Sequence, residues 1–121
     1  MKTPEDDLID FMLNYSDIFG GYIGYWGRGM RTRSGGFKAW LIVEHDGLSY
    51  EEADELLNRS DQDLAAGKPV VSPVHLLDQT SAKRVIEEGK KKYGEKFADN
   101  YDATMLDVAI QRALLGEVRY G

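Results

Sequence analysis

The first regular pattern along the chain is an apolar repeat with spacings of four, three and four residues, formed by Leu8, Met12, Tyr15 and Phe19. This spacing places apolar side chains on one face of a helix. Thr3 and Pro4 suit an N-cap and a first helical position, so the pattern predicts a helix over 4–18. The glycine pair at 20–21 is expected to end it, because glycine readily takes the left-handed backbone found after helix ends.

Two short stretches then favour strands. Residues 22–26 are rich in aromatic side chains, which are common in strands. Residues 37–43 alternate between two faces, one with Phe37, Ala39, Leu41 and Val43 and the other with Lys38, Trp40 and Ile42. Together they predict an antiparallel hairpin. Its connection of about ten residues exceeds the usual hairpin turn, and long connections are often functional.

Two more helices follow in the pattern. Ser49 and Glu52 have the spacing of a capping box, and an apolar stripe continues from there to Gly67. A further helix is predicted over 82–97, capped by Thr80 or Ser81 and weakened by two glycines. Its inward face is formed by Val85, Ile86 and Tyr93. The intervening residues 68–80 fit either a short edge strand or a loop.

Residues 103–115 are apolar at nine of thirteen positions, on all sides of the axis, which predicts a helix buried on most sides. Three of its four polar residues form one stripe, Thr104, Asp107 and Gln111. Buried polar groups cost about 1–3 kcal/mol each without partners, so we expect the stripe to meet a ligand, another helix or a second subunit. Gly116 ends this helix, and 117–120 is expected to return as a short strand.

Length and composition place these elements in one folded unit. The chain has 121 residues, which favours a single domain over 1–121. The pattern predicts an α+β fold in which a short antiparallel sheet packs against about four helices. The absence of cysteine excludes disulfides and thiolate metal sites, and it suits a reducing cytosol.

Charge is unevenly distributed. The net charge is −6, yet residues 27–38 contain Arg28, Arg31, Arg33 and Lys38 and no acid. An acidic protein is a poor general binder of long nucleic acid or of membrane surfaces, since both require a basic face. The sequence has neither a signal-peptide pattern at its start nor an apolar run long enough for a membrane span, so we expect neither export nor membrane insertion.

The chain carries no common catalytic or metal-binding motif. It lacks a GxSxG element and a Walker loop, and its glycine-rich stretch at 20–29 does not follow a strand. His45 and His75 lack metal-ligand spacing, so we interpret them as a turn histidine and a half-buried one. The basic run at 90–92 reads as an exposed helix face. No catalytic residue, metal or cofactor is therefore expected.

One constellation suggests a ligand. Aromatic rings can stack on nucleobases and guanidinium groups can hold phosphates, and both kinds of residue adjoin in Tyr22, Tyr25, Trp26, Arg28, Arg31 and Arg33. Asp107 and Gln111 could read a base edge or ribose. The alternative is that the aromatics belong to the hairpin core and the arginines to a solvated turn.

Two segments resemble a group of small bacteriophage proteins: GGYIGYW at 20–26 and DVAIQRALLGEVRYG at 107–121. Gly24 and Leu115 depart from the patterns expected for that group. The group is similar to phage anti-CBASS sponges, non-enzymatic proteins that sequester cyclic dinucleotides such as 3′3′-cGAMP from bacterial immunity. The resemblance implies a homotetramer acting in the cytoplasm of the infected host.

Under this reading, Arg28, Arg31 and Arg33 would hold phosphates, and Tyr22, Tyr25 and Trp26 would stack on bases. The apolar circumference of the 103–115 helix separately favours a homo-oligomer, because an uncovered apolar patch commonly marks an interface. Two alternatives remain open: a protein-binding inhibitor of a host defence complex, similar to an anti-CRISPR, and a phosphodiesterase of the same signal.

Overall fold

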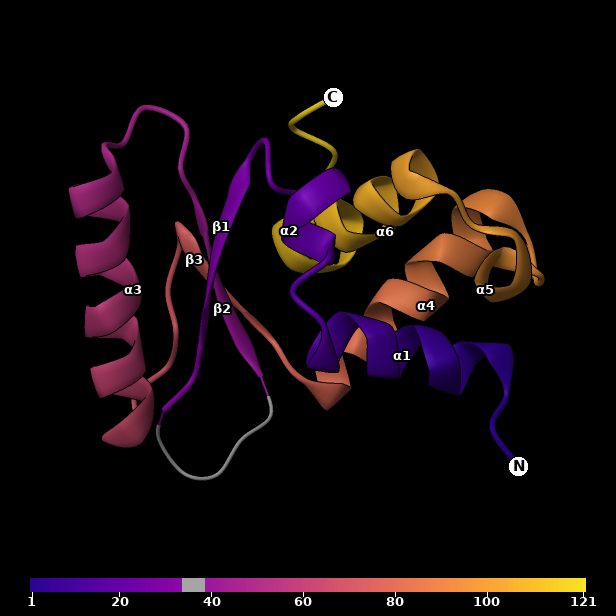
Figure 1. The fold of residues 1–121 in the computed structure, drawn as a ribbon, viewed down its shortest axis with the longest axis horizontal. Coiled ribbons are helices and arrows are strands. Elements are labelled where there is room, and N and C mark those ends of the chain that lie inside the picture. Colours follow the sequence, from indigo (N-terminus) through magenta and orange to yellow (C-terminus); the bar gives the residue numbers. More distant parts are fainter. Residues whose placement is uncertain (34–38) are drawn as a thin grey trace.

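The computed structural model describes residues 1–33 and 39–121. In this part of the chain, a three-stranded antiparallel sheet has helix α3 on one face and the other helices on the opposite face (Figure 1), which confirms the α+β fold. The strands are β1 (Gly27–Arg31), β2 (Trp40–Glu44) and β3 (Val74–Leu77), in the order β1-β2-β3.

Helix α1 (Pro4–Asn14) starts as predicted, with Thr3 and Asp6 forming a reciprocal capping box. It ends earlier than expected, because the backbone turns extended at Tyr15. Ser16 and Asp17 follow, and such residues favour turns because their side chains compete for backbone hydrogen bonds. A separate one-turn helix, α2 (Ile18–Gly21), comes next, so the continuous helix over 4–18 was wrong in its last turn.

The predicted aromatic strand over 22–26 was also wrong. These residues form a turn in which the carbonyl of Ile23 accepts from the N–H groups of Trp26 and Gly27, at 3.0 and 2.8 Å. Local bonds thus replace a strand ladder. The first strand, β1, begins only at Gly27. Arg28 and Arg31, which we expected in the loop of the hairpin, therefore belong to β1.

An antiparallel hairpin is present, but its first strand is β1 rather than the predicted 22–26. It pairs with β2, with Gly29 facing Ile42. The predicted alternation along β2 holds as well. Trp40 and Ile42 join the larger core under α1, α4 and α6, whereas Leu41 and Val43 join a smaller core under α3. Phe37 and Lys38, the start of the predicted strand, lie outside the described residues.

Helix α3 (Tyr50–Ala65) has the predicted capping box, and residues 74–77 form the edge-strand alternative as β3. Helix α4 (Gln79–Tyr93) begins earlier than predicted, because Asp78 is its N-cap. The Asp78 carboxylate accepts from the backbone N–H of Ser81, and the Ser81 hydroxyl accepts from the backbone N–H of Asp78. The helix also ends earlier, at Gly94, and α5 (Phe97–Asn100) is a separate turn.

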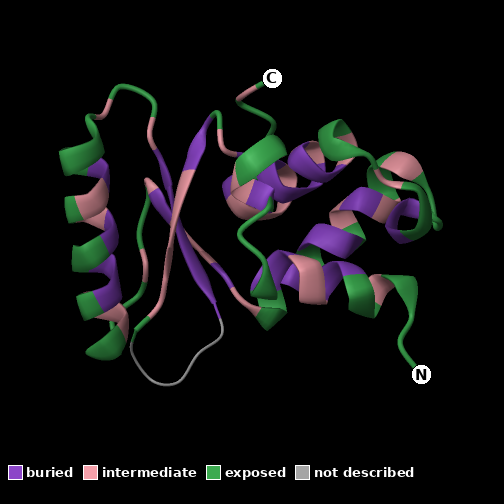
Figure 2. Ribbon diagram, in the orientation of Figure 1, coloured by how far each residue is buried: buried purple, intermediate pink, exposed green. Residues whose placement is uncertain are grey.

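Helix α6 (Ala103–Leu115) has the predicted bounds. It packs mainly against α4, and its fully buried apolar residues are Leu106, Ala109 and Ile110. Figure 2 shows buried and intermediate residues along much of this helix. The chain's own fold therefore covers much of the apolar surface from which we expected an oligomer. Residues 117–120 do not return as a strand, since their main chain bonds to a side chain instead.

In the part of the chain that the structure describes, no helix combines the length and the apolar character needed to cross a bilayer.

Candidate ligand cleft and its supporting network

The polar stripe on α6 faces the aromatic turn at 22–26. The Asp107 carboxylate accepts from the hydroxyl of Tyr25, from the indole N–H of Trp26 at 2.8 Å, and from the amide of Gln111 at 2.9 Å. Burial, and then the Asp107 charge, raise the pKa of Tyr25 to about 12. The structure thus brings four predicted site residues together, but in bonds to one another. Thr104, the third member of the stripe, is exposed.

Gln111 fixes the C-terminal segment. Its side-chain oxygen accepts from the backbone N–H groups of Arg119 and Tyr120, at 2.8 and 2.9 Å, and its amide nitrogen donates to the carbonyl of Tyr120. The side chain is fully buried, with 0% exposure. The Gln111 amide pairs with main-chain groups as a neighbouring strand would, so its hydrogen-bonding groups are used within the protein.

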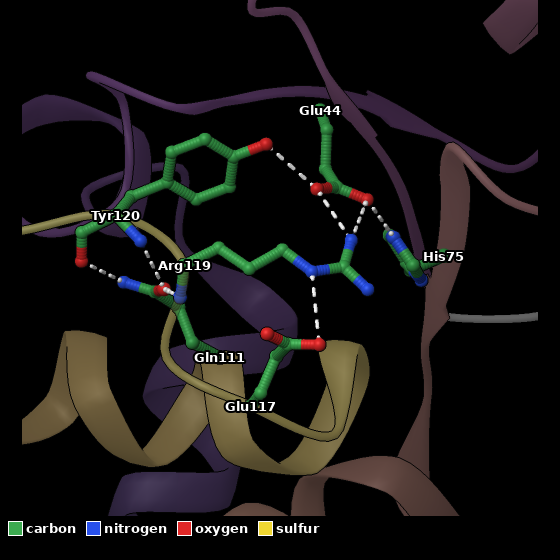
Figure 3. A network of polar contacts seen from close by, with 6 residues as sticks. All are labelled: Glu44, His75, Gln111, Glu117, Arg119 and Tyr120. Carbon is green, nitrogen blue, oxygen red and sulfur yellow. Dashed lines mark hydrogen bonds and ion pairs between the residues drawn. The ribbon is translucent and has the colours of Figure 1, made fainter.

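A second cluster surrounds Glu44, at the end of β2 (Figure 3). Its carboxylate accepts from His75 at 2.8 Å, from the hydroxyl of Tyr120 at 2.7 Å, and from Arg119 at 3.0 Å. Burial alone would raise the pKa of Glu44, but these hydrogen bonds outweigh it and the pKa is lowered. Burial and then Glu44 raise the pKa of Tyr120 to about 12. This cluster joins β2, β3 and the C-terminal segment.

The two clusters together form a scaffold. Asp107 and Gln111 use their groups on intramolecular partners, so the structure gives them the network role left open as an alternative to base reading. Trp26 is likewise internal, with 1% exposure. Tyr22 is half-buried and packs edge-on against Phe11. Tyr25 keeps about half of its surface exposed, although its hydroxyl is bound.

A cleft of about 730 Å³ lies beside this scaffold, at the outer edge of β1. Its size falls within the usual range of small-molecule sites. Three aromatic residues line it, Phe19, Trp40 and Tyr50, together with Arg28 and His45. The lining comes from both faces of the sheet: Phe19 and Trp40 belong to the α1–α6 side, and Tyr50 to the α3 side.

The edge of β1 is open for a physical reason. In an antiparallel pair, alternate residues direct their N–H and C=O groups toward the partner strand. Thr32 donates to Ala39 and His45 donates to Trp26, so the even-numbered residues of β1 face β2. The main-chain groups of Gly29 and Arg31 therefore point outward, toward the edge that carries the cleft.

The scaffold holds one wall of the cleft in place. The backbone N–H of His45 donates to the carbonyl of Trp26 at 3.0 Å, and its ring Nε2 lies 3.1 Å from the carbonyl of Gly24. Trp26 is fixed in turn by Asp107. The C-terminal segment, the aromatic turn and His45 thus form one connected structure.

The three arginines do not converge. Arg28 lies in the cleft, where it bonds Asp54 at 2.7 and 3.2 Å and covers the ring of Tyr50. Arg31 lies on the opposite face of β1, stacked over Trp40 with a distance of 4.2 Å to the ring centroid. Arg33 is exposed, and its backbone N–H donates to Asp61. Alternation along the strand separates Arg28 from Arg31, and Arg33 lies beyond the end of β1.

Sequence reasoning missed Phe19, Trp40, Tyr50 and His45 as cleft residues, and it missed the whole cluster at Glu44. The predicted alternation correctly puts Trp40 and Leu41 on opposite faces of the strand. The pattern does not indicate that the Trp40 face lies beside Phe19. The interpretation of the two histidines as a turn residue and a half-buried residue fits their positions, since His45 follows β2 at a turn and His75 is half-buried.

Within residues 1–33 and 39–121, no group of three or more His, Asp or Glu side chains could hold a metal ion. No family model, curated protein or solved structure matches the chain.

Proposed function

We propose that the protein binds an anionic nucleotide of the cyclic dinucleotide class in the cleft beside β1 and holds it without cleaving it. The observation that carries the proposal is the chemistry of the lining. Three aromatic rings and the guanidinium of Arg28 surround one cavity of about 730 Å³. Flat π faces suit nucleobases, and positive charge suits phosphates.

The lining supports binding rather than hydrolysis. Ser49 uses its hydroxyl to accept the capping bond from Glu52, and the His45 ring bonds the carbonyl of Gly24. Neither contact is the hydroxyl–imidazole pair that activates a nucleophile. A phosphodiesterase therefore remains the weaker alternative, and sequestration of an intact nucleotide is the function that fits these contacts.

The resemblance to anti-CBASS sponges supplies the biological setting of this proposal. The ligand would be a 3′3′-cGAMP-like signal, the protein would act in the cytoplasm of an infected bacterium, and the assembly would be a homotetramer. Light scattering at low micromolar concentration, with and without nucleotide, measures the mass. A tetramer supports the sponge assembly, and a monomer in both conditions removes the oligomer from the proposal.

A second candidate is the protein-binding inhibitor, and the open edge of β1 favours it. Outward N–H and C=O groups at Gly29 and Arg31 can pair with an extended segment of a partner protein, as in strand addition. The basic side chains at the strand would favour an acidic segment. This candidate gains weight if no nucleotide binds.

Isothermal titration of the purified protein with a panel of cyclic di- and trinucleotides tests the proposal. We expect saturable binding, weakened about ten- to hundredfold in Arg28→Gln, which removes a charged donor from the lining. Arg59→Gln is the matched control, because Arg59 is an exposed arginine on α3 that pairs with Glu55 and does not line the cleft. Equal binding by both variants would place the ligand elsewhere.

A further inference from the structure

Trp40 has an unpaired hydrogen-bond donor beside the cleft. Its side chain lies among the lining residues and is only 7% exposed, and its indole Nε1 is buried with no acceptor in the part of the chain that the structure describes. Buried polar groups almost always have partners, so an unpaired one requires an explanation. The other tryptophan, Trp26, has its partner in Asp107.

The charge next to Trp40 is also unmatched. The guanidinium of Arg31 stacks over the Trp40 ring and donates to the backbone carbonyl of Leu13, a neutral acceptor. No carboxylate lies within salt-bridge distance of it among the described residues. Arg28, by contrast, has its charge compensated by Asp54. Among the described residues, the guanidinium next to Trp40 therefore has no carboxylate as an ion-pair partner.

A third donor points to the same edge. The N–H of Gly29 is directed outward from β1, on the strand that carries Arg31. Phe19 lies against this position: a Cβ at residue 29 would be 2.1 Å from its ring, and the ring meets Trp40 edge-on at 5.0 Å. Phe19 is half-buried and comes from the short helix α2, so one ring contacts both Gly29 and Trp40 at this edge.

We propose that Trp40 is a ligand-binding residue, and that its indole N–H and the Gly29 N–H form the phosphate-binding end of the cleft. The Arg31 guanidinium, which stacks over Trp40 outside the cleft lining, supplies positive charge next to that end. The inference rests on the proposed nucleotide function and assigns which end of the cleft holds which part of the ligand. A phosphate oxygen accepts from Trp40, and a base lies toward Tyr50, where the Arg28 guanidinium donates to the other end of the ligand. The arrangement explains why a donor is kept buried and unpaired.

Titration calorimetry with 3′3′-cGAMP on three proteins tests this assignment: the parent, Trp40→Phe and Arg31→Gln. We expect both variants to bind about ten- to hundredfold more weakly, the effect of losing one charge-assisted hydrogen bond. Guanosine, a probe without phosphate, should bind the parent and Trp40→Phe with affinities within threefold of each other.

Thermal unfolding of Trp40→Phe and Trp26→Phe separates this role from packing. Both changes remove the same volume and one N–H, but only Trp26 loses a satisfied hydrogen bond. The melting temperature should therefore fall further in Trp26→Phe.

Three results would count against the assignment. Unchanged 3′3′-cGAMP binding in Trp40→Phe overturns the role of Trp40 and leaves the proposed function standing. Equal weakening of guanosine and 3′3′-cGAMP overturns the phosphate assignment. Absence of binding by the parent to any cyclic nucleotide overturns the proposed function and, with it, this inference.

Discussion

The indole ring of Trp26 and the phenol ring of Tyr120 lie stacked, with 5.5 Å between centroids and 5° between planes. This contact joins the aromatic turn near the start of the chain to its last residues. Both rings are also anchored by carboxylates, Trp26 by Asp107 and Tyr120 by Glu44. The aromatic turn and the C-terminal segment thus form one scaffold behind the cleft.

Replacing Gln111 tests that scaffold. Gln111→Leu keeps the side chain near its original size but removes its bonds to Asp107 and to the C-terminal main chain. We expect a loss of about 1–3 kcal/mol in the free energy of unfolding, because buried polar groups lose their partners. Urea unfolding measures it. Thr104→Val, on an exposed position of the same helix, should change stability by less than about 0.5 kcal/mol. Similar values for the two variants would contradict the scaffold.

The Glu44 cluster predicts that the free energy of unfolding depends on pH in the acidic range. The folded protein holds the pKa of Glu44 below its ordinary value of 4.5. A lowered pKa in the folded state stabilises the protein above pH 4.5, and that stabilisation is lost as the pH falls through the folded pKa. Glu44→Gln should therefore be less stable than the parent at pH 7, and the gap should narrow below pH 4.5. A constant gap between pH 7 and pH 3 would contradict this role for the carboxylate.

Gly89 on α4 should resist replacement by alanine. A Cβ at this position would lie 2.3 Å from the ring of Phe97, which is fully buried. Overpacking costs about 1–3 kcal/mol, more than the roughly 1 kcal/mol that alanine gains in helix propensity. We expect Gly89→Ala to lower the melting temperature. A melting temperature equal to or above that of the parent would show that Phe97 moves aside freely.

A variant of Arg33 distinguishes binding in the cleft from binding to the basic segment at 27–38 as a whole. It is exposed, lies beyond the end of β1 and does not line the cleft. Arg33→Ala should therefore bind 3′3′-cGAMP within about twofold of the parent at moderate salt, because a distant exposed charge is largely screened. A loss as large as that expected for Arg31→Gln would move the phosphate site to the basic segment at 27–38.

The sequence was sufficient to predict α6, α3 and the second strand of the hairpin, because capping residues and apolar periodicity act locally. It failed at 22–26, where aromatic residues suggested a strand. Their backbone bonds are instead satisfied within a turn around Ile23. The actual strand, β1, contains two glycines and two arginines, a composition with low strand propensity.

The candidate site was only partly predictable, for a related reason. The sequence singled out Tyr25, Trp26, Asp107 and Gln111 as candidate ligand-binding residues, but the pattern could not tell a ligand site from the internal network that they form. Glu44, His75 and Tyr120 are far apart in the chain, and only the tertiary fold brings them together. Trp40 and Phe19 meet in the same way.

The most direct test of nucleotide sequestration is uptake followed by release. The purified protein is incubated with 3′3′-cGAMP, freed of unbound nucleotide, and heated until it unfolds, and the released material is identified by chromatography. The account predicts saturable uptake and release of the intact nucleotide, with a clear rise in melting temperature before release; ligand at 100 times its Kd adds about 2.7 kcal/mol of stability. Release of a cleaved product, or no uptake of any cyclic di- or trinucleotide in the same assay, would contradict it.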